Sequence, residues 1–136
     1  DLLNQPLPDG PFDLVVLFGV IHHMPGAVQR HQLMRDLAER VAPGGVLALA
    51  AWRFYDNPRF RNKTLDWPPG LEREAGDYLL DWRRGTVAQR YCHHVDDDEH
   101  DQLVGVTGLQ EVARYRADGK DERTNQYSIL TGPIGS

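Results

Sequence analysis

The chain has 136 residues, 40% of them hydrophobic and 9% aromatic, which fits a single globular domain. Its formal net charge of −5 excludes polyanion binding that is driven by the charge of the whole molecule. No apolar run approaches the roughly 18–20 residues that a membrane span needs, so we expect no membrane partner. The single cysteine, Cys92, excludes an internal disulfide and indicates the cytoplasm.

The first part of the chain, residues 1–52, predicts a strand, a helix and a second strand. Residues 12–18 are an almost unbroken apolar run, which is typical of a strand buried on both faces in a parallel sheet. An amphipathic helix follows, with one apolar face formed by Leu33, Met34, Leu37, Ala38 and Val41. Pro43-Gly44-Gly45 is predicted to stop this helix, and residues 46–52 to form the second buried strand. Such a βαβ unit has parallel strands and a right-handed crossover.

The middle of the chain, residues 53–80, shows no sustained period and contains several prolines and glycines. We predict a long loop with a short helix on the substrate side of the protein. Residues 78–82 and 87–95 are predicted to be extended.

The C-terminal part, residues 81–131, is predicted to hold a strand, a helix and a β-hairpin. The acidic run 96–99 suits a helix N-terminus, because carboxylates are stabilised by the positive end of the helix dipole. Residues 109–116 and 125–131 are predicted strands, and the turn between them makes them antiparallel. The expected fold is therefore α/β: a partial doubly wound sheet of two parallel strands plus a C-terminal antiparallel hairpin.

The residues that follow the first strand are candidate ligand contacts. Ligands of open α/β sheets bind outside the carboxyl ends of the strands, where Gly19, Val20, His22 and His23 are expected. A glycine there lets the backbone approach a ligand closely. The alternative interpretation is that one of the two adjacent histidines points away from the ligand and packs or is solvated.

Residues 53–63 interleave four cations with three aromatic residues. Cations neutralise phosphates while aromatic faces stack on unpaired bases, so Arg53, Tyr55 and Arg59 are candidate substrate contacts for RNA. Residues 53–94 carry eight Lys or Arg against six Asp or Glu, whereas the rest of the chain is acidic, which favours a polyanion at this face. The alternative is a solvated loop that covers the sheet.

A second group of candidates lies on the predicted strand over residues 87–95. Tyr91 and His93 share one face of that strand and are candidate substrate contacts. Arg90 points to the other face and is suited to hold a substrate carboxylate with two hydrogen bonds, although a structural ion pair would use it equally well. The His, Cys and Asp residues of 92–100 match no zinc-binding spacing, so we expect no metal.

The order of these elements resembles the C-terminal half of the class I methyltransferases. Residues 12–16 with Ile21-His22-His23 look like the fourth strand of that family and its loop, and residues 37–47 look like the helix and the fifth strand. The resemblance implies a Rossmann-like fold with the strand order four–five–seven–six, and S-adenosylmethionine as the cofactor.

Three strings resemble the wobble-uridine tRNA carboxymethyl methyltransferases more narrowly: Ala51-Trp52, Arg90-Tyr91-Cys92-His93, and residues 121–130 as the closing strand. The resemblance implies methyl transfer to a carboxymethyl group on a tRNA wobble uridine. A small-molecule methyltransferase and a non-catalytic, methyltransferase-like binding module stay open as alternatives.

The resemblance also assigns roles to residues. Asp1 and Leu2 resemble the pair that meets the adenine, so they join the residues after the first strand, Gly19, Val20 and His22, as candidate cofactor contacts. The candidate catalytic residues are His23 and Arg90.

This sequence departs from the family because it has no glycine-rich turn of the kind that holds the methionine part of the cofactor. We therefore expect residues 1–136 to be the C-terminal portion of a methyltransferase domain that lacks its N-terminal half and is inactive alone. The strand over residues 12–18 normally pairs with the missing first strand. Left open, it is expected to make a homodimer by edge pairing or to be poorly soluble.

Overall fold

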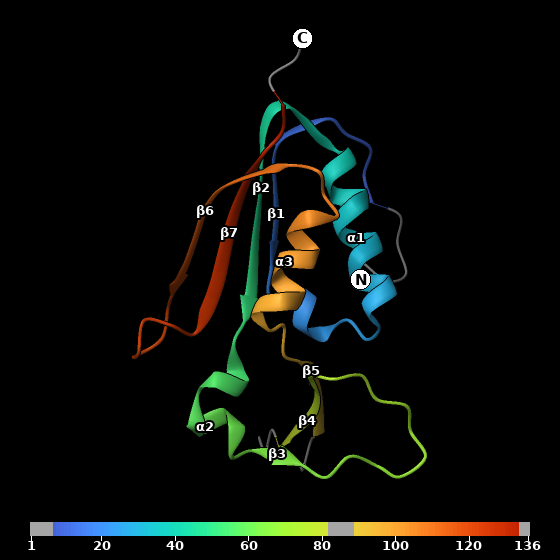
Figure 1. The fold of residues 1–136 in the computed structure, drawn as a ribbon, viewed down its shortest axis with the longest axis vertical. Coiled ribbons are helices and arrows are strands. Elements are labelled where there is room, and N and C mark those ends of the chain that lie inside the picture. The colour runs from blue at the N-terminus through green and yellow to red at the C-terminus, as the bar shows by residue number, and fades with distance from the viewer. Residues whose placement is uncertain (1–6, 82–88, 134–136) are drawn as a thin grey trace.

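The structure, a computed structural model, describes residues 7–81 and 89–133. Within these residues the chain forms a four-stranded mixed sheet with two helices against it, and a smaller three-stranded antiparallel sheet below one end of the first (Figure 1). None of the described helices is both long enough and apolar enough to cross a membrane.

The larger sheet is built on a parallel pair of strands. Strand β1 spans Phe12–Phe18 and strand β2 spans Val41–Trp52, and the two run in the same direction with Leu17 opposite Leu49. Helix α1, Ala27–Glu39, connects them. This arrangement confirms the predicted βαβ unit.

The predicted end of the first helix is wrong. Helix α1 ends at Glu39 and β2 begins at Val41, so Pro43-Gly44-Gly45 lies inside β2, where the pairing with β1 is irregular. A β carbon on Gly45 would lie 2.9 Å from the carbonyl oxygen of Ala42. The glycine therefore serves a close backbone approach within the strand rather than a helix stop.

The C-terminal elements complete the larger sheet. Helix α3, Asp97–Gly105, begins after Asp96, whose carboxylate accepts a hydrogen bond from the backbone N–H of Glu99, as an N-cap does. Strands β6, Gln110–Ala117, and β7, Asn125–Thr131, form the predicted antiparallel hairpin. Because β7 also pairs antiparallel with β2, the strand order is β1-β2-β7-β6, which confirms the expected partial doubly wound α/β sheet.

Residues 53–80, predicted as a loop with a short helix, contain more regular structure than expected. The segments predicted to be extended, residues 78–82 and 87–95, overlap the strands at Asp77–Asp81 and Gln89–His93, which confirms that prediction for the described residues. The pairing of these strands with Thr64–Leu65 into a separate sheet is not indicated by any local sequence pattern. We call residues 53–81 and 89–94 the lobe. Its elements are η2, Phe54–Asp56; α2, Pro58–Arg61; β3, Thr64–Leu65; β4, Asp77–Asp81; and β5, Gln89–His93.

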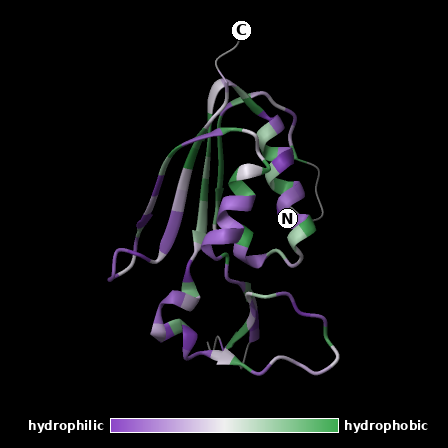
Figure 2. Ribbon diagram, in the orientation of Figure 1, coloured by the Kyte–Doolittle hydropathy of each residue, from purple (hydrophilic) through white to green (hydrophobic). Residues whose placement is uncertain are grey.

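Two separate apolar clusters support the two parts. The main cluster lies between the larger sheet and its two helices, and Figure 2 shows the hydrophobic stretches of β1 and β2 behind helices that are hydrophobic on one side only. The second cluster lies inside the lobe around Phe54, Leu80 and Cys92. The two clusters share no residue.

One face of the larger sheet is uncovered by the described residues. On β1, Leu17 is buried beneath the helices, whereas Leu14 is 62% exposed and Val16 and Phe18 are also exposed. Strand β1 is moreover an edge of the sheet. The apolar run over residues 12–18 therefore has the composition of a two-sided buried strand but is covered on one side in this part of the chain.

Candidate functional site

The two parallel strands end at the same edge of the sheet, and the chain turns there. Gly19 follows β1 with a φ of 73°, and a β carbon at this position would meet no atom within 4 Å. A 3-10 turn, Ile21–His23, comes next, and the His23 N–H donates to the Val20 carbonyl at 2.9 Å. Because Ile21 is fully buried, the turn is anchored while its two histidines stay at the edge.

His22 packs into this edge as an uncharged ring. It is 7% exposed, and its ring meets that of Trp52 edge-on at 5.4 Å and that of His23 at 4.1 Å. Burial lowers the pKa of His22 to about 3, and the charges of His23 and Arg90 act in the same direction. Its Nδ1 is buried and has no hydrogen-bond partner among the described residues. A polar group of a bound ligand would satisfy this atom.

His23 is half-buried beside the same cation. Burial lowers the pKa of His23, the charge of Arg90 lowers it further, and a backbone hydrogen bond with Tyr91 opposes the shift. Both rings are therefore neutral at pH 7, and the ring of His23, the less buried of the two, can accept a proton from a neighbouring group.

Strand β5 places two of the candidates predicted on residues 87–95 beside the candidates that follow β1. Arg90 and Tyr91 of β5 lie next to the turn that holds His22 and His23, which gathers four of the predicted site residues at the carboxyl ends of β1 and β2. We call this edge the rim. The sequence order alone, with more than 60 residues between the two groups, does not indicate that they meet.

His93 is placed in the interior rather than at the rim. It is fully buried, its Nδ1 lies 2.7 Å from Asp77 Oδ1, and its Nε2 lies 2.5 Å from Glu99 Oε1. The Tyr91 hydroxyl donates to the same Asp77 oxygen at 2.7 Å, so Tyr91 and His93 do share a face of β5 as predicted. Neither nitrogen of His93 is left for a substrate.

The two carboxylates around His93 are held in their ionised form. Burial would raise the pKa of Asp77, but hydrogen bonds from the Glu74 backbone, Tyr91 and His93 lower it below its usual value. Burial would likewise raise the pKa of Glu99, but the hydrogen bond and charge of His93, together with Arg30, lower that pKa below its usual value.

Arg30 completes this buried polar group, and the sequence interpretation missed it. Arg30 of α1 is 1% exposed. Its Nε donates to Glu99 at 2.7 Å and its Nη1 donates to the Met24 carbonyl at 2.8 Å. Its spacing of three, four and seven residues from buried positions Leu33, Met34 and Leu37 is the signal that would have found it.

The candidates from residues 53–63 separate into two kinds. Arg53 is buried, with ion pairs to Asp56 at 2.9 Å and Asp97 at 3.1 Å, so the structure gives it a structural role instead of the predicted substrate contact. Tyr55 and Arg59 lie on the lobe surface instead, where Tyr55 is half-buried and Arg59 is exposed.

Comparison with known proteins identifies the relatives of this chain. Residues 1–49 match the family model described as a methyltransferase domain. A putative methyltransferase of Encephalitozoon cuniculi is 30% identical over 112 residues, which cover 82% of this chain and 47% of that protein. The crystal structure of a SAM-dependent methyltransferase from Methanosarcina mazei has a TM-score of 0.69 at 17% identity, covering 93% of this chain and 62% of that one. The chain is related to the class I, Rossmann-like methyltransferases.

The name of a second curated relative includes a substrate. The probable tRNA methyltransferase 9B of Mus musculus is 28% identical over 138 residues, which cover 93% of this chain and 28% of that protein. The chain therefore spans less than half the length of these two methyltransferase relatives. Of the predicted cofactor contacts, Asp1 and Leu2 lie outside the described residues, although they fall within the match to the methyltransferase domain.

Proposed function

We propose that this chain supplies the acceptor side of an S-adenosylmethionine-dependent methyltransferase whose acceptor is the carboxylate of a carboxymethyl group on a tRNA wobble uridine. The product is a methyl ester. The observation that carries the proposal is the gathering of neutral His22, neutral His23 and cationic Arg90 at the rim. Because the chain spans less than half the length of the two curated relatives, the activity is proposed for the whole methyltransferase domain.

Two features of the rim fit the cofactor. The open space beside Gly19 admits a ligand close to the backbone, and the unpartnered Nδ1 of buried His22 is a polar atom that such a ligand would satisfy. Gly19, Val20 and His22 would hold the cofactor, with Asp1 and Leu2 as the proposed adenine contacts. When bound, the cofactor supplies a methyl group that is already activated by the positive charge on sulfur.

The chain's own residues position the acceptor and keep water out. Arg90 binds the acceptor carboxylate through two parallel N–H···O hydrogen bonds, which fixes its orientation as well as its place. A carboxylate, with an ordinary pKa near 4, is ionised at pH 7 and needs no general base. For a hydroxyl or amine acceptor, the neutral ring of His23 would take the proton. Holding two reactants in line in a dry site is worth several kcal/mol, up to about 7–11.

The test is methyl transfer by the protein expressed from its gene together with any sequence in frame around the chain. It is incubated with S-adenosylmethionine tritiated on the methyl group and tRNA that carries 5-carboxymethyluridine at the wobble position. A methyl ester is cleaved by mild base, whereas N-methyl groups and methyl ethers are stable to it. We expect tritium on the tRNA that mild base releases as methanol.

Matched variants connect the activity to the rim. Loss of a charge-assisted hydrogen bond costs about 1.5–3 kcal/mol, so Arg90→Gln should lower kcat/KM by about 10- to 150-fold. Arg35→Gln removes an equal charge from an exposed position on α1 and should leave kcat/KM unchanged. Base-stable label, or label on small carboxylic acids and none on tRNA, would contradict the tRNA acceptor. Absence of label on every acceptor would contradict methyl transfer itself.

A further inference from the structure

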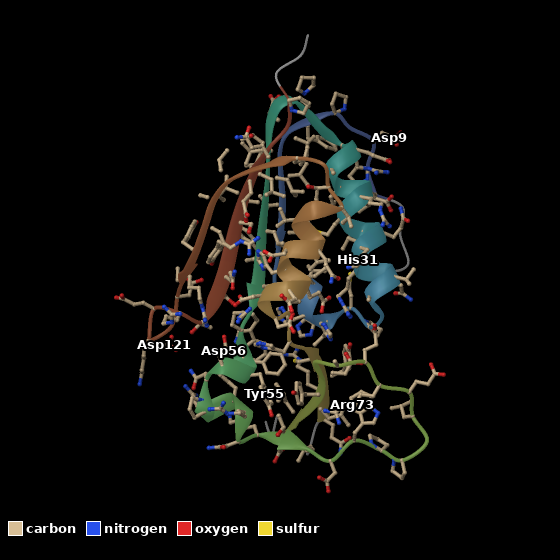
Figure 3. The ribbon with its side chains drawn as sticks, in the orientation of Figure 1. Asp9, His31, Tyr55, Asp56, Arg73 and Asp121 are labelled. Carbon is tan, nitrogen blue, oxygen red and sulfur yellow. The ribbon has the colours of Figure 1, made fainter. Side chains whose placement is uncertain are left out.

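The lobe carries a row of alternating cations and aromatic rings that the methyl-transfer proposal does not use. Tyr55 and Tyr78 stack at 4.3 Å with 16° between their ring planes. The Arg61 guanidinium lies 5.8 Å from the centre of the Tyr55 ring, and that of Arg73 lies 5.2 Å from Tyr78 and 5.3 Å from Trp67. We call these five side chains the ladder. Figure 3 labels Tyr55 and Arg73, which both lie on the lobe below the larger sheet.

The ladder gathers residues that are far apart in the sequence. Tyr55 comes from η2, Arg61 from the end of α2, and Tyr78 from β4, whereas Trp67 and Arg73 come from the segment between β3 and β4. The three-stranded sheet of the lobe is what brings these segments together. The sequence interpretation reached as far as Arg61 but missed the second half of the row.

The cations of the ladder are available to a ligand. Arg61 and Arg73 are exposed, and neither has a carboxylate partner within residues 7–81 and 89–133. Arg59, which lies 5.3 Å from the centre of the Phe60 ring, is likewise exposed and unpaired in this part of the chain. By contrast, Arg30 and Arg53 are buried in ion pairs. Three exposed guanidinium groups of the lobe therefore have no carboxylate partner among the described residues, although Arg73 Nε donates to the Asp77 carbonyl at 2.9 Å.

A guanidinium group that stacks on an aromatic ring is well oriented to bind a phosphate. The group is planar, so an aromatic ring beneath it holds its orientation while its N–H donors point outward from the edge of the plane. A phosphate accepts two of these donors at once. Trp67, half-buried at the end of the row, adds an aromatic surface of the kind on which an unpaired base stacks.

The ladder also reaches the rim. The Trp67 and Tyr91 rings are 6.4 Å apart, and Tyr91 makes the backbone hydrogen bond to His23. A strand that follows the ladder from Arg61 towards Trp67 therefore arrives beside the paired histidines. Continuity of this kind is expected if one ligand occupies both places.

We propose that the ladder, together with Arg59 of helix α2, binds an unpaired segment of RNA, with its phosphates on Arg59, Arg61 and Arg73 and a base stacked on Trp67. An acidic peptide would satisfy the cations but has no base to stack, and a duplex keeps its bases inside. The direction of the strand towards the rim rests on the proposed function. RNA binding itself does not, because it requires neither cofactor nor methyl transfer.

The first test measures the phosphate contacts. The 136-residue chain is titrated into a fluorescently labelled 17-nucleotide anticodon stem-loop, and anisotropy is recorded at several NaCl concentrations. Each phosphate contact on a single strand contributes about 0.7 to the slope of log K against log salt, which is about 5-fold in affinity at 0.1 M salt. The variant Arg59→Gln/Arg61→Gln/Arg73→Gln should bind about 100-fold more weakly and flatten the slope by about 2. Arg35→Gln, an exposed cation on α1, is the matched control and should change neither.

The second test measures stacking. Trp67→Leu keeps an apolar side chain but removes the flat ring, and should weaken binding of the stem-loop by about 5- to 150-fold, because one stacked base contributes about 1–3 kcal/mol. The same variant should leave the weaker binding of a fully paired duplex unchanged. Near-ultraviolet circular dichroism confirms that the variants keep the fold.

Three results would overturn the inference: no binding of the stem-loop by the wild-type chain, equal binding by the triple variant, or equal loss of stem-loop and duplex binding in Trp67→Leu. The two proposals fail separately. Methyl transfer to free carboxylic acids without RNA binding would refute RNA binding by the ladder and leave the methyltransferase proposal standing. RNA binding without methyl transfer would refute the methyltransferase proposal and leave RNA binding by the ladder standing.

Discussion

The stability of this chain should fall as the pH is lowered towards 5, and His100 provides the sharpest test. His100 is fully buried in α3, and its Nε2 lies 2.6 Å from the hydroxyl oxygen of Ser128. Burial lowers the pKa of His100 from 6.5 to about 4, with Arg114 acting in the same direction. The unfolded chain therefore takes up a proton at a higher pH than the folded chain does. The stabilisation is complete above pH 6.5 and is lost as the pH falls towards 4.

The size of the effect follows from this difference. At pH 5, which is 1.5 units below the ordinary histidine pKa of 6.5, the histidine of the unfolded chain is protonated, whereas folded His100 is still mostly neutral. Each pH unit is worth 1.36 kcal/mol, so His100 alone should account for about 2 kcal/mol of stability lost between pH 7 and pH 5. His22 and His94, whose pKa values are also lowered by burial, add to the total loss of the wild-type chain.

The assay is urea unfolding followed by tryptophan fluorescence at pH 7 and at pH 5. His100→Gln removes the titrating ring but keeps an amide that can donate to Ser128. The loss of unfolding free energy between the two pH values should be about 2 kcal/mol smaller in His100→Gln than in the wild-type chain. Because the other histidines are the same in both proteins, they cancel in this comparison. An equal loss in the two proteins would refute the assignment of a lowered pKa to buried His100.

Two further predictions concern the buried polar group and the open edge of the sheet. Arg30→Met should destabilise the chain by about 3–5 kcal/mol in urea unfolding at pH 7, because it leaves Glu99 without its cation. The control Arg35→Met, at an exposed position, should change the unfolding free energy by less than about 0.5 kcal/mol. Similar losses in the two variants would count against the buried pair. The isolated chain should self-associate through β1 in light scattering, and Val16→Lys should shift it to a monomer. A monodisperse wild-type monomer would be evidence against edge pairing.

Local patterns predicted the elements whose information is local. Four signals are local in this sense: the apolar run of β1, the apolar run of β2, the acidic N-terminus of α3 and the turn of the β6–β7 hairpin. Each of them is contained in a short stretch of consecutive residues. The strand order followed from the family resemblance. The end of α1 was misplaced because apolar Val41 continues the helical period, whereas in the structure Val41 begins β2.

The candidate site was predicted only in part, for the same reason. His22 and His23 follow a strand, so the rule for open α/β sheets locates them without knowledge of distant residues. The roles of Arg53 and His93 depend instead on partners from α3, Asp97 for the first and Glu99 for the second. A carboxylate 44 residues away decides that Arg53 is structural, and no spacing in the sequence reveals it.

The separation of the two apolar clusters has an evolutionary consequence. The lobe and the sheet are joined largely by polar contacts: His93 with Glu99, Arg53 with Asp97, and Asp56 with Arg116. Trp52 at the end of β2 is the apolar side chain of the larger sheet that packs against the lobe cluster. Substitutions on the lobe surface can thus accumulate without disturbing the scaffold that underlies the chemistry. The side chains that join the lobe to the sheet are the positions at which such substitutions would disturb both parts.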